Sequence, residues 1–324
     1  GFNSHGVIAV KGGEVSPRDI ERALDAAKAV AIPLDREVIH ILPQEYIVDD
    51  QRGIADPMGM AGVRLEVKVH IVTGAVTSAQ NIVRSCHKSG LDVSDIVLES
   101  LASAKAVLTE EEREIGVALI DLGGGTCDIA IFANDSIKHT GVLALGGQNL
   151  TNDIAFGLRT PMAAAEKIKI KHGAAIAEMV RPDEYIEVPS VGGREPRRLS
   201  RQVLAEICEP RMEEILTLLD QELVRSGLKN MIGAGVVLTG GTALIQGCQE
   251  LGEQVFNLPT RIGYPRNVGG LKDMVNSPKF ATAMGLLRFG AEKEGMEQKF
   301  RIRSDGNVFN SILSRMKKWF SEIS

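Results

Sequence analysis

Long hydrophobic runs are missing from this sequence of 324 residues, since no apolar stretch approaches the roughly 20 residues that a membrane-spanning helix requires. Cysteine is scarce, and the four cysteines form no CxxC pair, so neither a disulfide framework nor a zinc site of that type is expected. The six histidines are scattered without metal-ligand spacing. With a net charge of −5, the chain also lacks the basic excess that is typical of nucleic-acid binding.

The composition is that of a soluble globular protein, with 44% apolar and 24% charged residues. A length of 324 residues predicts about two domains. The chain starts at Gly1 rather than at methionine and soon reaches the strand-like segment Val7–Val10. We therefore expect it to be a piece of a longer protein whose beginning is missing.

The spacing of apolar residues predicts alternating helices and strands. Ser16 is the expected N-cap of a helix with Pro17 at its first position, and residues 37–50 and 64–74 are extended. Thr77 or Ser78 is expected to cap a helix that Gly90 ends. The further expected elements are a strand at 95–100 (DIVLES), a small-residue helix at 101–108 (LASAKAVL), a charged turn at 109–114 (TEEERE), an extended segment at 134–145, a mostly helical region at 161–228 with a strand-turn interruption at 182–199, and a helix opened by Ser277 and Pro278.

A glycine turn between two apolar runs is the most informative motif. In VALIDLGGGTCDIAIF, residues 117–132, Asp121 and Asp128 flank three glycines and a threonine. Glycines let several backbone N–H groups approach one point, and such a nest binds anions. An aspartate beside a bound phosphate is well placed to hold Mg²⁺ through water. The stretch alone fits a tight β-hairpin equally well.

A second glycine turn changes which of these two interpretations is favoured. In VVLTGGTALIQG, residues 236–247, two glycines and a threonine again follow a buried strand. By itself this pattern fits an ordinary turn between strand and helix. Together, the two turns favour a nucleotide site between two lobes. The site is not a Walker A loop, because no GxxxxGK[ST] occurs, and no GxGxxG opens a helix as in dinucleotide-binding folds.

These motifs resemble a known superfamily. DLGGGTCD is similar to the second phosphate motif of actin, heat-shock chaperones and sugar kinases, VVLTGGTALIQG to their adenosine motif, and LASAKAVL to their first connecting helix. Within the superfamily the chain resembles the FtsA family of bacterial cell-division proteins. The segments that carry this resemblance are HILPQEYIVDDQRGI, MAGVRLEVKVHIVT, IEVPSVGG and the amphipathic C-terminus, while AEKIKIKHG resembles the helix whose Glu and Lys flank the adenosine in bacterial actin relatives more widely.

The resemblance implies an actin-like α/β fold of two lobes around ATP, with an inserted subdomain particular to the family. The implied division is an inserted subdomain at 1–73, the remainder of the first lobe at 74–115, the second lobe at 116–160 and 236–290, its helical subdomain at 161–235, a polar linker at 291–306 and a terminal amphipathic helix at 307–324.

The resemblance also assigns ligand contacts. Asp121 is expected near Mg²⁺, with Gly123, Gly124, Gly125 and Thr126 on the phosphates. The expected adenosine contacts are Gly240, Gly241, Thr242, Glu166 and Lys169, although the last two also fit an exposed helical charge pair.

One part of the family pattern has no match. The family's first phosphate loop lies in a hairpin before the inserted subdomain, and no such hairpin is in this sequence. We therefore expect weak ATP binding by these residues alone. Glu99 is the one candidate for orienting a water in ATP hydrolysis, and a surface carboxylate is the simpler interpretation, so at most a weak ATPase is expected.

The C-terminus has the pattern of an amphipathic helix. Its apolar side carries the chain's only tryptophan, and three basic residues and one acidic residue lie on or beside the other side, which is typical of a helix lying in the membrane interface. Docking into the protein's own core or a partner groove is the alternative. The expected membrane contacts are Phe309, Ile312, Leu313, Arg315, Met316, Lys317, Lys318, Trp319 and Phe320.

The FtsA resemblance further implies partners and a location. FtsA-like proteins tether filaments of the tubulin-like FtsZ to the cytoplasmic face of the inner membrane at the division site, assemble into actin-like filaments and contact other division proteins. The FtsZ C-terminal tail is expected to dock at 161–235, where arginines suit an acidic peptide; the candidates are Arg197, Arg201 and Arg211. A pilus-assembly adaptor and an ATPase or kinase of the same superfamily are the alternatives.

Overall fold

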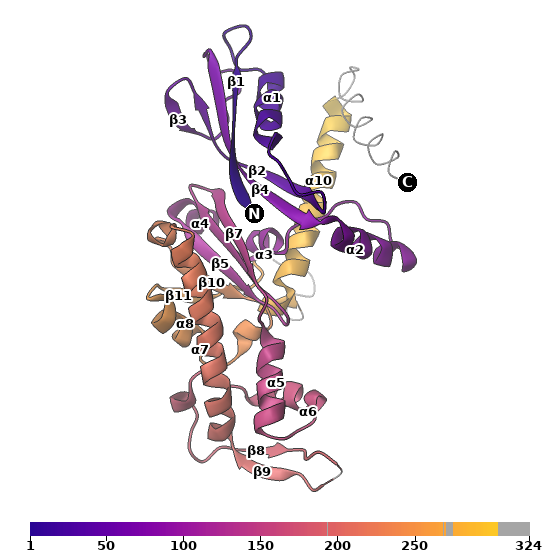
Figure 1. Cartoon of the computed structure of the whole chain (residues 1–324), viewed down its shortest axis with the longest axis vertical. Helices are drawn as coiled ribbons and strands as arrows, with labels where there is room; N and C mark the ends of the chain where they lie inside the picture. Colours follow the sequence, from indigo (N-terminus) through magenta and orange to yellow (C-terminus); the bar gives the residue numbers. More distant parts are fainter. Residues whose placement is uncertain (193, 268, 270–274, 304–324) are drawn as a thin grey trace.

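The computed structural model describes residues 1–192, 194–267, 269 and 275–303. Three regions follow one another along the long axis of the molecule (Figure 1). A four-stranded sheet with one helix occupies one end, a five-stranded sheet flanked by helices lies in the middle, and a helical region with a two-stranded sheet forms the other end.

The four-stranded sheet is antiparallel and has the order β1-β4-β2-β3. Helix α1 packs on it through Ala23 and Ala27, and Ser16 and Asp19 form the capping box that starts the helix. The predicted helix and extended segments of 1–73 are therefore confirmed. The elements are β1 (Phe2–Ala9), α1 (Pro17–Lys28), β2 (Arg36–Val48), β3 (Gln51–Ile54) and β4 (Arg64–Ala75).

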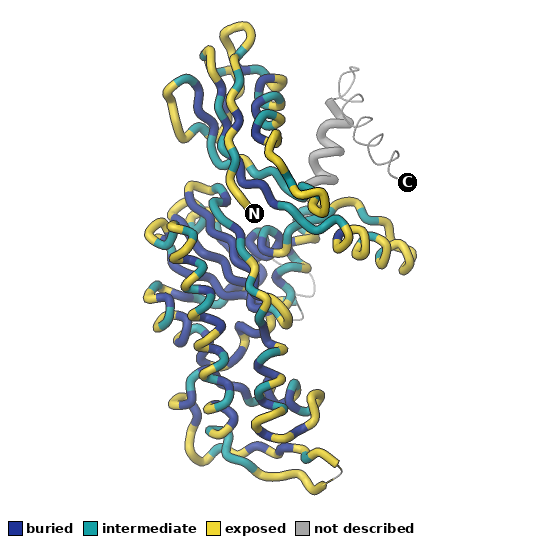
Figure 2. Tube along the Cα trace, in the orientation of Figure 1, coloured by how far each residue is buried: buried dark blue, intermediate teal, exposed yellow. Residues whose placement is uncertain are grey.

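The five-stranded sheet has the order β11-β10-β5-β6-β7. Strands β5, β10 and β11 are parallel, whereas β5, β6 and β7 form consecutive antiparallel pairs. All residues of β5 and β6 are buried, as Figure 2 shows in dark blue, so helices must cover both faces. The strands are β5 (Val117–Leu122), β6 (Cys127–Ala133), β7 (Ser136–Leu143), β10 (Val236–Thr239) and β11 (Thr260–Ile262).

Different helices cover the two faces of this sheet. Ile120 and Ile129 belong to a core shared with α5, α7 and α8, whereas Leu119 and Ala130 belong to a core shared with α3 and α10. Asp121 follows Leu119 by two residues and therefore lies on the α3–α10 face. These helices are α3 (Glu99–Val107), α5 (Gly147–Gly157), α7 (Arg201–Arg225), α8 (Cys248–Phe256) and α10 (Ala281–Arg303).

The helical end of the molecule is built on α7, which extends beyond the sheet (Figure 1). Helix α6 (Met162–His172) packs beside α5, and the antiparallel strands β8 (Tyr185–Val188) and β9 (Arg197–Ser200) close this end. The predicted strand-turn interruption of a helical region is therefore confirmed. Single-turn helices occur at η1 (Ala177–Met179), η2 (Lys229–Met231), η3 (Thr242–Leu244) and η4 (Pro278–Phe280).

Three predictions of local structure between residues 77 and 115 were wrong. Residues 95–98 form no strand, because a strand needs a hydrogen-bonded neighbour and the described residues supply none there. Residues 110–115 form a helix, α4 (Glu110–Ile115), rather than a turn, because Thr109 and Glu112 make a capping box. Helix α2 (Val76–Lys88) starts after Ala75 with no side-chain cap, so neither Thr77 nor Ser78 caps it.

The range 291–306, predicted to be a polar linker, continues as helix α10 up to Arg303. Ala, Glu, Lys, Met and Gln dominate this stretch, and all of them are strong helix formers. The amphipathic segment 307–324 lies outside the described residues. Among the helices that are described, none combines the length and the hydropathy needed to cross a bilayer.

Helices α3 and α10 approach each other closely at Gly285. A Cβ atom at this position would lie 1.8 Å from the carbonyl oxygen of Ala102, which is backbone and cannot move aside. We therefore expect Gly285→Ala to lower the free energy of unfolding, measured in urea, by about 1–3 kcal/mol through overpacking. Gly290→Ala is the matched control on the same helix, because its Cβ would meet nothing within 4 Å. Equal effects of the two substitutions would contradict the close approach.

Candidate functional site

The two predicted glycine turns lie side by side at one edge of the central sheet. Parallel strands β5 and β10 pair with Thr239 opposite Asp121, so the turns that follow both strands leave from the same edge. Gly240 has φ +88°, and a Cβ there would lie 2.4 Å from Asp121 Oδ1. This position requires glycine for its backbone conformation and for the space beside the carboxyl group.

The first turn presents unused backbone donors. The N–H group of Gly123 closes the hairpin onto the carbonyl oxygen of Thr126 at 3.0 Å. Within the part of the chain that the structure describes, the N–H groups of Gly124 and Gly125 have no hydrogen-bond acceptor. Both glycines are exposed, and a Cβ at either would meet nothing within 4 Å. The turn therefore offers free N–H groups and open space, which suits an anion.

The carbonyl groups of the same turn are held by the protein. The N–H group of Gly147 donates to the oxygen of Gly123 at 3.0 Å, and that of Gln148 donates to the oxygen of Gly124 at 2.7 Å. The hydroxyl group of Thr242, which follows the second glycine turn, also donates to the oxygen of Gly123, at 2.9 Å. The start of α5 and the second turn thus hold the first turn through its carbonyl oxygens.

Asp121 is almost fully buried beside these turns. Its Oδ2 accepts hydrogen bonds from the Ser103 hydroxyl at 2.6 Å and the Thr282 hydroxyl at 3.3 Å. Desolvation raises the pKa of Asp121, and the two hydroxyl groups partly offset this. Sequence reasoning missed both residues, although Ser103 stands in LASAKAVL, where a hydroxyl in a small-residue helix is a usable signal.

Two further carboxyl groups belong to the same neighbourhood. Asp128 is the cross-strand partner of Asp121, is buried, and accepts a hydrogen bond from the Thr126 hydroxyl at 3.2 Å. Burial raises the pKa of Asp128, to which the charge of Asp121 adds. At Glu99, which is exposed at the surface, partial desolvation and then the charges of Asp128 and Asp121 raise the pKa to about 7. Asp128, for which the sequence suggested no chemical role, therefore shapes the charge at this site.

Among the described residues, no group of three or more His, Cys, Asp or Glu side chains is placed to hold a metal ion, so these carboxyl groups form no direct metal cage. A metal ion beside Asp121 would therefore depend on water and on a ligand such as phosphate for most of its contacts. The expectation that Asp121 faces Mg²⁺ through water stays a prediction.

Glu166 and Lys169 lie on α6, beside the start of α5. Lys169 is only 8% exposed, so the two residues are not the exposed charge pair that the sequence left open. The Lys169 ammonium group donates to Glu166 Oε2 at 2.7 Å, to Thr151 Oγ1 at 2.9 Å and to the oxygen of Gly147 at 3.0 Å. Lys169 is thereby joined to the first glycine turn through Gly147.

The three arginines predicted to bind a partner differ in their surroundings. Arg201 donates to the oxygen of His172 and pairs with Glu184, and Arg211 pairs with Asp153 on α5. Arg197 is exposed and makes a hydrogen bond to the backbone oxygen of Leu158. Two of the three guanidinium groups thus have internal carboxylate partners.

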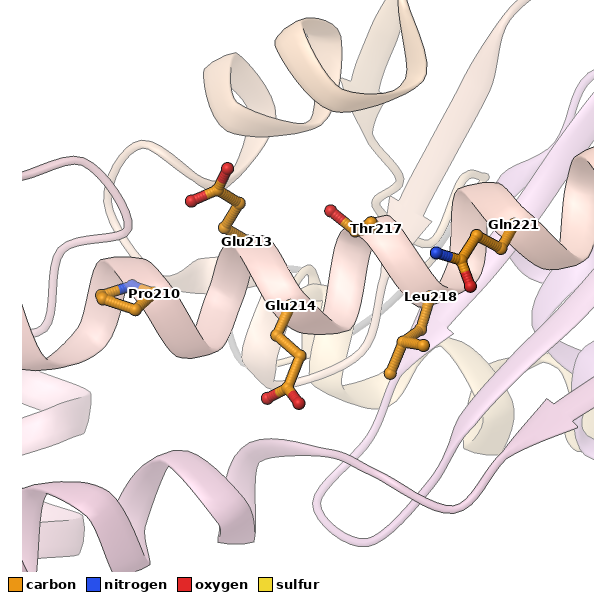
Figure 3. A pocket seen from close by; sticks show the side chains of 6 residues that line it. All are labelled: Pro210, Glu213, Glu214, Thr217, Leu218 and Gln221. Carbon is orange, nitrogen blue, oxygen red and sulfur yellow. The ribbon is translucent and has the colours of Figure 1, made fainter.

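Two surface pockets lie away from the glycine turns. One, of about 480 Å³, is lined by α3, α4, α10 and residues 266–267. The other, of about 380 Å³, lies on the exposed side of α7 and is lined by residues of that helix alone (Figure 3). No residue proposed above for nucleotide binding lines either pocket. The lining of the second is Pro210, Glu213, Glu214, Thr217, Leu218 and Gln221.

Two family models match the chain. The model described as "Cell division protein FtsA" matches residues 118–285, and that described as "SHS2 domain inserted in FTSA" matches residues 1–73. Among curated proteins, cell division protein FtsA of Pseudomonas aeruginosa is 50% identical over 98% of this chain and 77% of its own length. The FtsA proteins of Neisseria meningitidis and Escherichia coli are 44% and 41% identical, each over 98% of this chain and 78% and 77% of their own lengths.

Solved structures support the same fold at lower identity. MreB5 of Spiroplasma citri bound to ADP has a TM-score of 0.53 and 20% identity, covering 69% of this chain and 68% of that one. The PilM–PilN type IV pilus biogenesis complex has a TM-score of 0.57 and 16% identity, covering 89% and 76%. The predicted actin-like fold with an inserted subdomain is confirmed by these similarities and by the match at residues 1–73.

The raised pKa of Glu99 predicts that the stability of the folded protein depends on pH. Its pKa, raised from 4.5 to about 7, means that the folded state holds the proton more tightly than the unfolded state. Stability from this group is therefore present at low pH and lost as pH rises from about 4.5 to about 7. Glu99→Gln carries no titrating group, so its urea midpoint should fall less steeply over this range. Glu213→Gln, on the exposed face of α7, should follow the wild type, and a Glu99→Gln profile parallel to the wild type would refute the assignment.

Proposed function

Because the chain belongs to the FtsA family of cell division proteins, we propose that it is an actin-like ATP-binding scaffold. In this proposal it anchors FtsZ filaments to the cytoplasmic face of the inner membrane at the division site and helps to assemble the division machinery. The observation that carries the nucleotide part is the pair of glycine turns beside the buried Asp121.

The residues at these turns fit ATP and Mg²⁺. The free N–H groups of Gly124 and Gly125, together with Gly123 and Thr126, suit the phosphates, and Asp121 suits water bound to the metal ion. The adenosine would lie along Gly240, Gly241 and Thr242 with Glu166 nearby. Mg²⁺ would neutralise phosphate charge. Its positive charge would also favour the ionised forms of the carboxyl groups of Asp121, Asp128 and Glu99. The ADP in the MreB5 structure belongs to that protein, and at 20% identity the likeness supports the fold alone.

The membrane part of the proposal depends on the sequence of residues 307–324 and on family membership. The segment combines an apolar side containing Trp319 with Arg315, Lys317 and Lys318. Each basic residue near an anionic surface adds about 1 kcal/mol of attraction. Helix α10 leads to this segment from the central sheet and ends at Arg303.

For the FtsZ tail we propose docking within residues 161–235. Exposed Arg197 and its neighbour Arg198, which stacks over Tyr185 at 4.3 Å, are better placed for an acidic peptide than Arg201 and Arg211. Arg201 and Arg211 would stabilise this surface through their ion pairs with Glu184 and Asp153. Self-assembly into actin-like filaments, with the inserted subdomain as one contact, completes the proposal.

A weak ATPase is the second candidate. The observation that favours it is the pKa of Glu99, which at about 7 suits a group that exchanges a proton with water near neutral pH. Asp121 and Asp128, whose charges help to raise that pKa, lie close to the turn proposed for the phosphates.

Gly124→Ala tests the phosphate turn. A Cβ at Gly124 meets nothing within 4 Å in the protein, so stability should change by no more than about 0.5 kcal/mol. The added methyl group would occupy the space proposed for phosphate, so we expect at least about a tenfold loss of ATP affinity by calorimetry, on protein expressed from its complete gene. Gly290→Ala, on α10, is the control for binding, because its Cβ also meets nothing within 4 Å. Unchanged ATP affinity in Gly124→Ala would exclude this turn as the phosphate site.

Liposome co-sedimentation with a labelled FtsZ tail peptide tests the anchor and the adaptor together. The intact chain should pellet with vesicles containing anionic lipid and should carry the peptide with it. Removal of residues 308–324 should leave protein and peptide in the supernatant, still bound to each other. The double substitution Trp319→Glu and Phe320→Glu should act like the truncation, because it replaces apolar side chains of the segment by charged ones. Pelleting of the truncated chain would refute the anchor, and absence of peptide binding in both forms would refute the adaptor.

A further inference from the structure

The two oxygens of the Asp121 carboxyl group have different surroundings. Oδ2 accepts both hydrogen bonds, from Ser103 on α3 and from Thr282 on α10. Oδ1 accepts no hydrogen bond from any residue that the structure describes. No fully buried side-chain oxygen of the described residues lacks a partner, so Oδ1 reaches solvent although Asp121 is only 3% exposed. Oδ1 also lies beside the second glycine turn, where a Cβ at Gly240 would be 2.4 Å from it. One oxygen is therefore held by the protein, and the other is open beside the glycine turns.

The two hydroxyl groups contribute unequally. Each has one proton to donate, whereas an ionised carboxylate only accepts. The Ser103 hydroxyl lies 2.6 Å from Asp121 Oδ2, a short distance that is typical of a hydrogen bond to a charged acceptor. The Thr282 hydroxyl lies 3.0 Å from Ser103 Oγ and 3.3 Å from Asp121 Oδ2, so its one proton serves both. Ser103 therefore makes the stronger bond to the carboxyl group, and Thr282 makes a weaker one and also contacts Ser103.

The packing of α3 against α10 sets where these hydroxyl groups lie. Gly285 lies one turn after Thr282, and its backbone meets that of Ala102, the residue before Ser103. This close approach brings the two hydroxyl groups together beside the carboxyl group. Ser103 is fully buried, so its hydroxyl has no water to turn to. Rotation of an aspartate carboxyl group about its terminal torsion is otherwise broad, so fixed donors on one side are what can hold its plane.

We propose that Ser103 and Thr282 are positioning residues that hold the plane of the Asp121 carboxyl group and so keep Oδ1 open to water bound to a metal ion. The inference rests on the proposed nucleotide function for its consequence in metal binding, while its structural part concerns the ligand-free chain. Residues that orient a metal-side carboxylate commonly change metal affinity by 10- to 100-fold when they are lost. If the two hydroxyl groups only offset the burial of the carboxyl group, their loss would lower stability without any dependence on the metal.

Urea unfolding of the ligand-free chain tests the structural part by a double-mutant cycle. Ser103→Ala should lower the urea midpoint in the wild-type background and change it much less in an Asp121→Ala background, where the acceptor is gone. Thr260→Val is the matched control, because its buried hydroxyl bonds the oxygen of Leu258 at the far end of β11. It should lower the midpoint equally in both backgrounds. If Ser103→Ala does not fold, Thr282→Val decides the question in the same two backgrounds. Equal effects of the tested substitution in both would overturn the proposal.

Calorimetry with ATP in Mg²⁺ and in EDTA tests the consequence for binding, on protein expressed from its complete gene. Ser103→Ala should weaken binding of ATP about tenfold in Mg²⁺ and leave it unchanged in EDTA, since only the contact through the metal is disturbed. Thr282→Val, which loses the weaker bond, should show a smaller loss that again needs Mg²⁺, and Thr260→Val should show none. A loss by Ser103→Ala that is equal in Mg²⁺ and EDTA, or no loss at all, would refute positioning for the metal. If wild type binds no ATP, the proposed nucleotide function fails, and the urea cycle still decides whether Ser103 holds Asp121.

Discussion

The parallel pairing of β5 with β10 is the constraint on which the site depends. The two strands are far apart in the sequence, and their pairing sets Thr239 opposite Asp121. Each strand is followed at once by glycines, so one register places both turns at the same edge of the sheet. The bond from Thr242 to the oxygen of Gly123 joins the turns across that edge. A shift of β10 by one residue would turn its side chains to the opposite faces and separate Thr242 from Gly123.

Much of the fold was predictable because local signals agreed with the packing. Ser16 and Pro17 marked the start of α1, and the glycine-rich stretch after Asp121 marked the hairpin of β5 and β6. The two main failures have different causes. Residues 95–98 have strand-like composition but lack a strand to pair with in the described residues, which local sequence could not show. Thr109 and Glu112 form a capping box, a local signal that the prediction of a charged turn overlooked.

The candidate site was predictable in its motifs and not in its contacts. The glycines and Asp121 could be identified from short sequence patterns. The hydroxyl groups of Ser103 and Thr282 could not, because α3 and α10 reach Asp121 only after the chain has folded over the sheet. The burial of Lys169 was equally hidden, since a lysine on a helix is usually exposed. Its cost is offset by three bonds from one ammonium group, which ties α6 to α5.

Helix α10 begins at the site and ends far from it. Thr282, in its first turn, donates a hydrogen bond to Asp121, and the helix continues without interruption for 23 residues to Arg303. At 1.5 Å per residue this is a rod of about 34 Å. Helix α10 therefore joins the buried carboxyl group of Asp121 to Arg303 through one continuous helix, so the edge of the sheet where the glycine turns meet has a stiff connection to a point about 34 Å away.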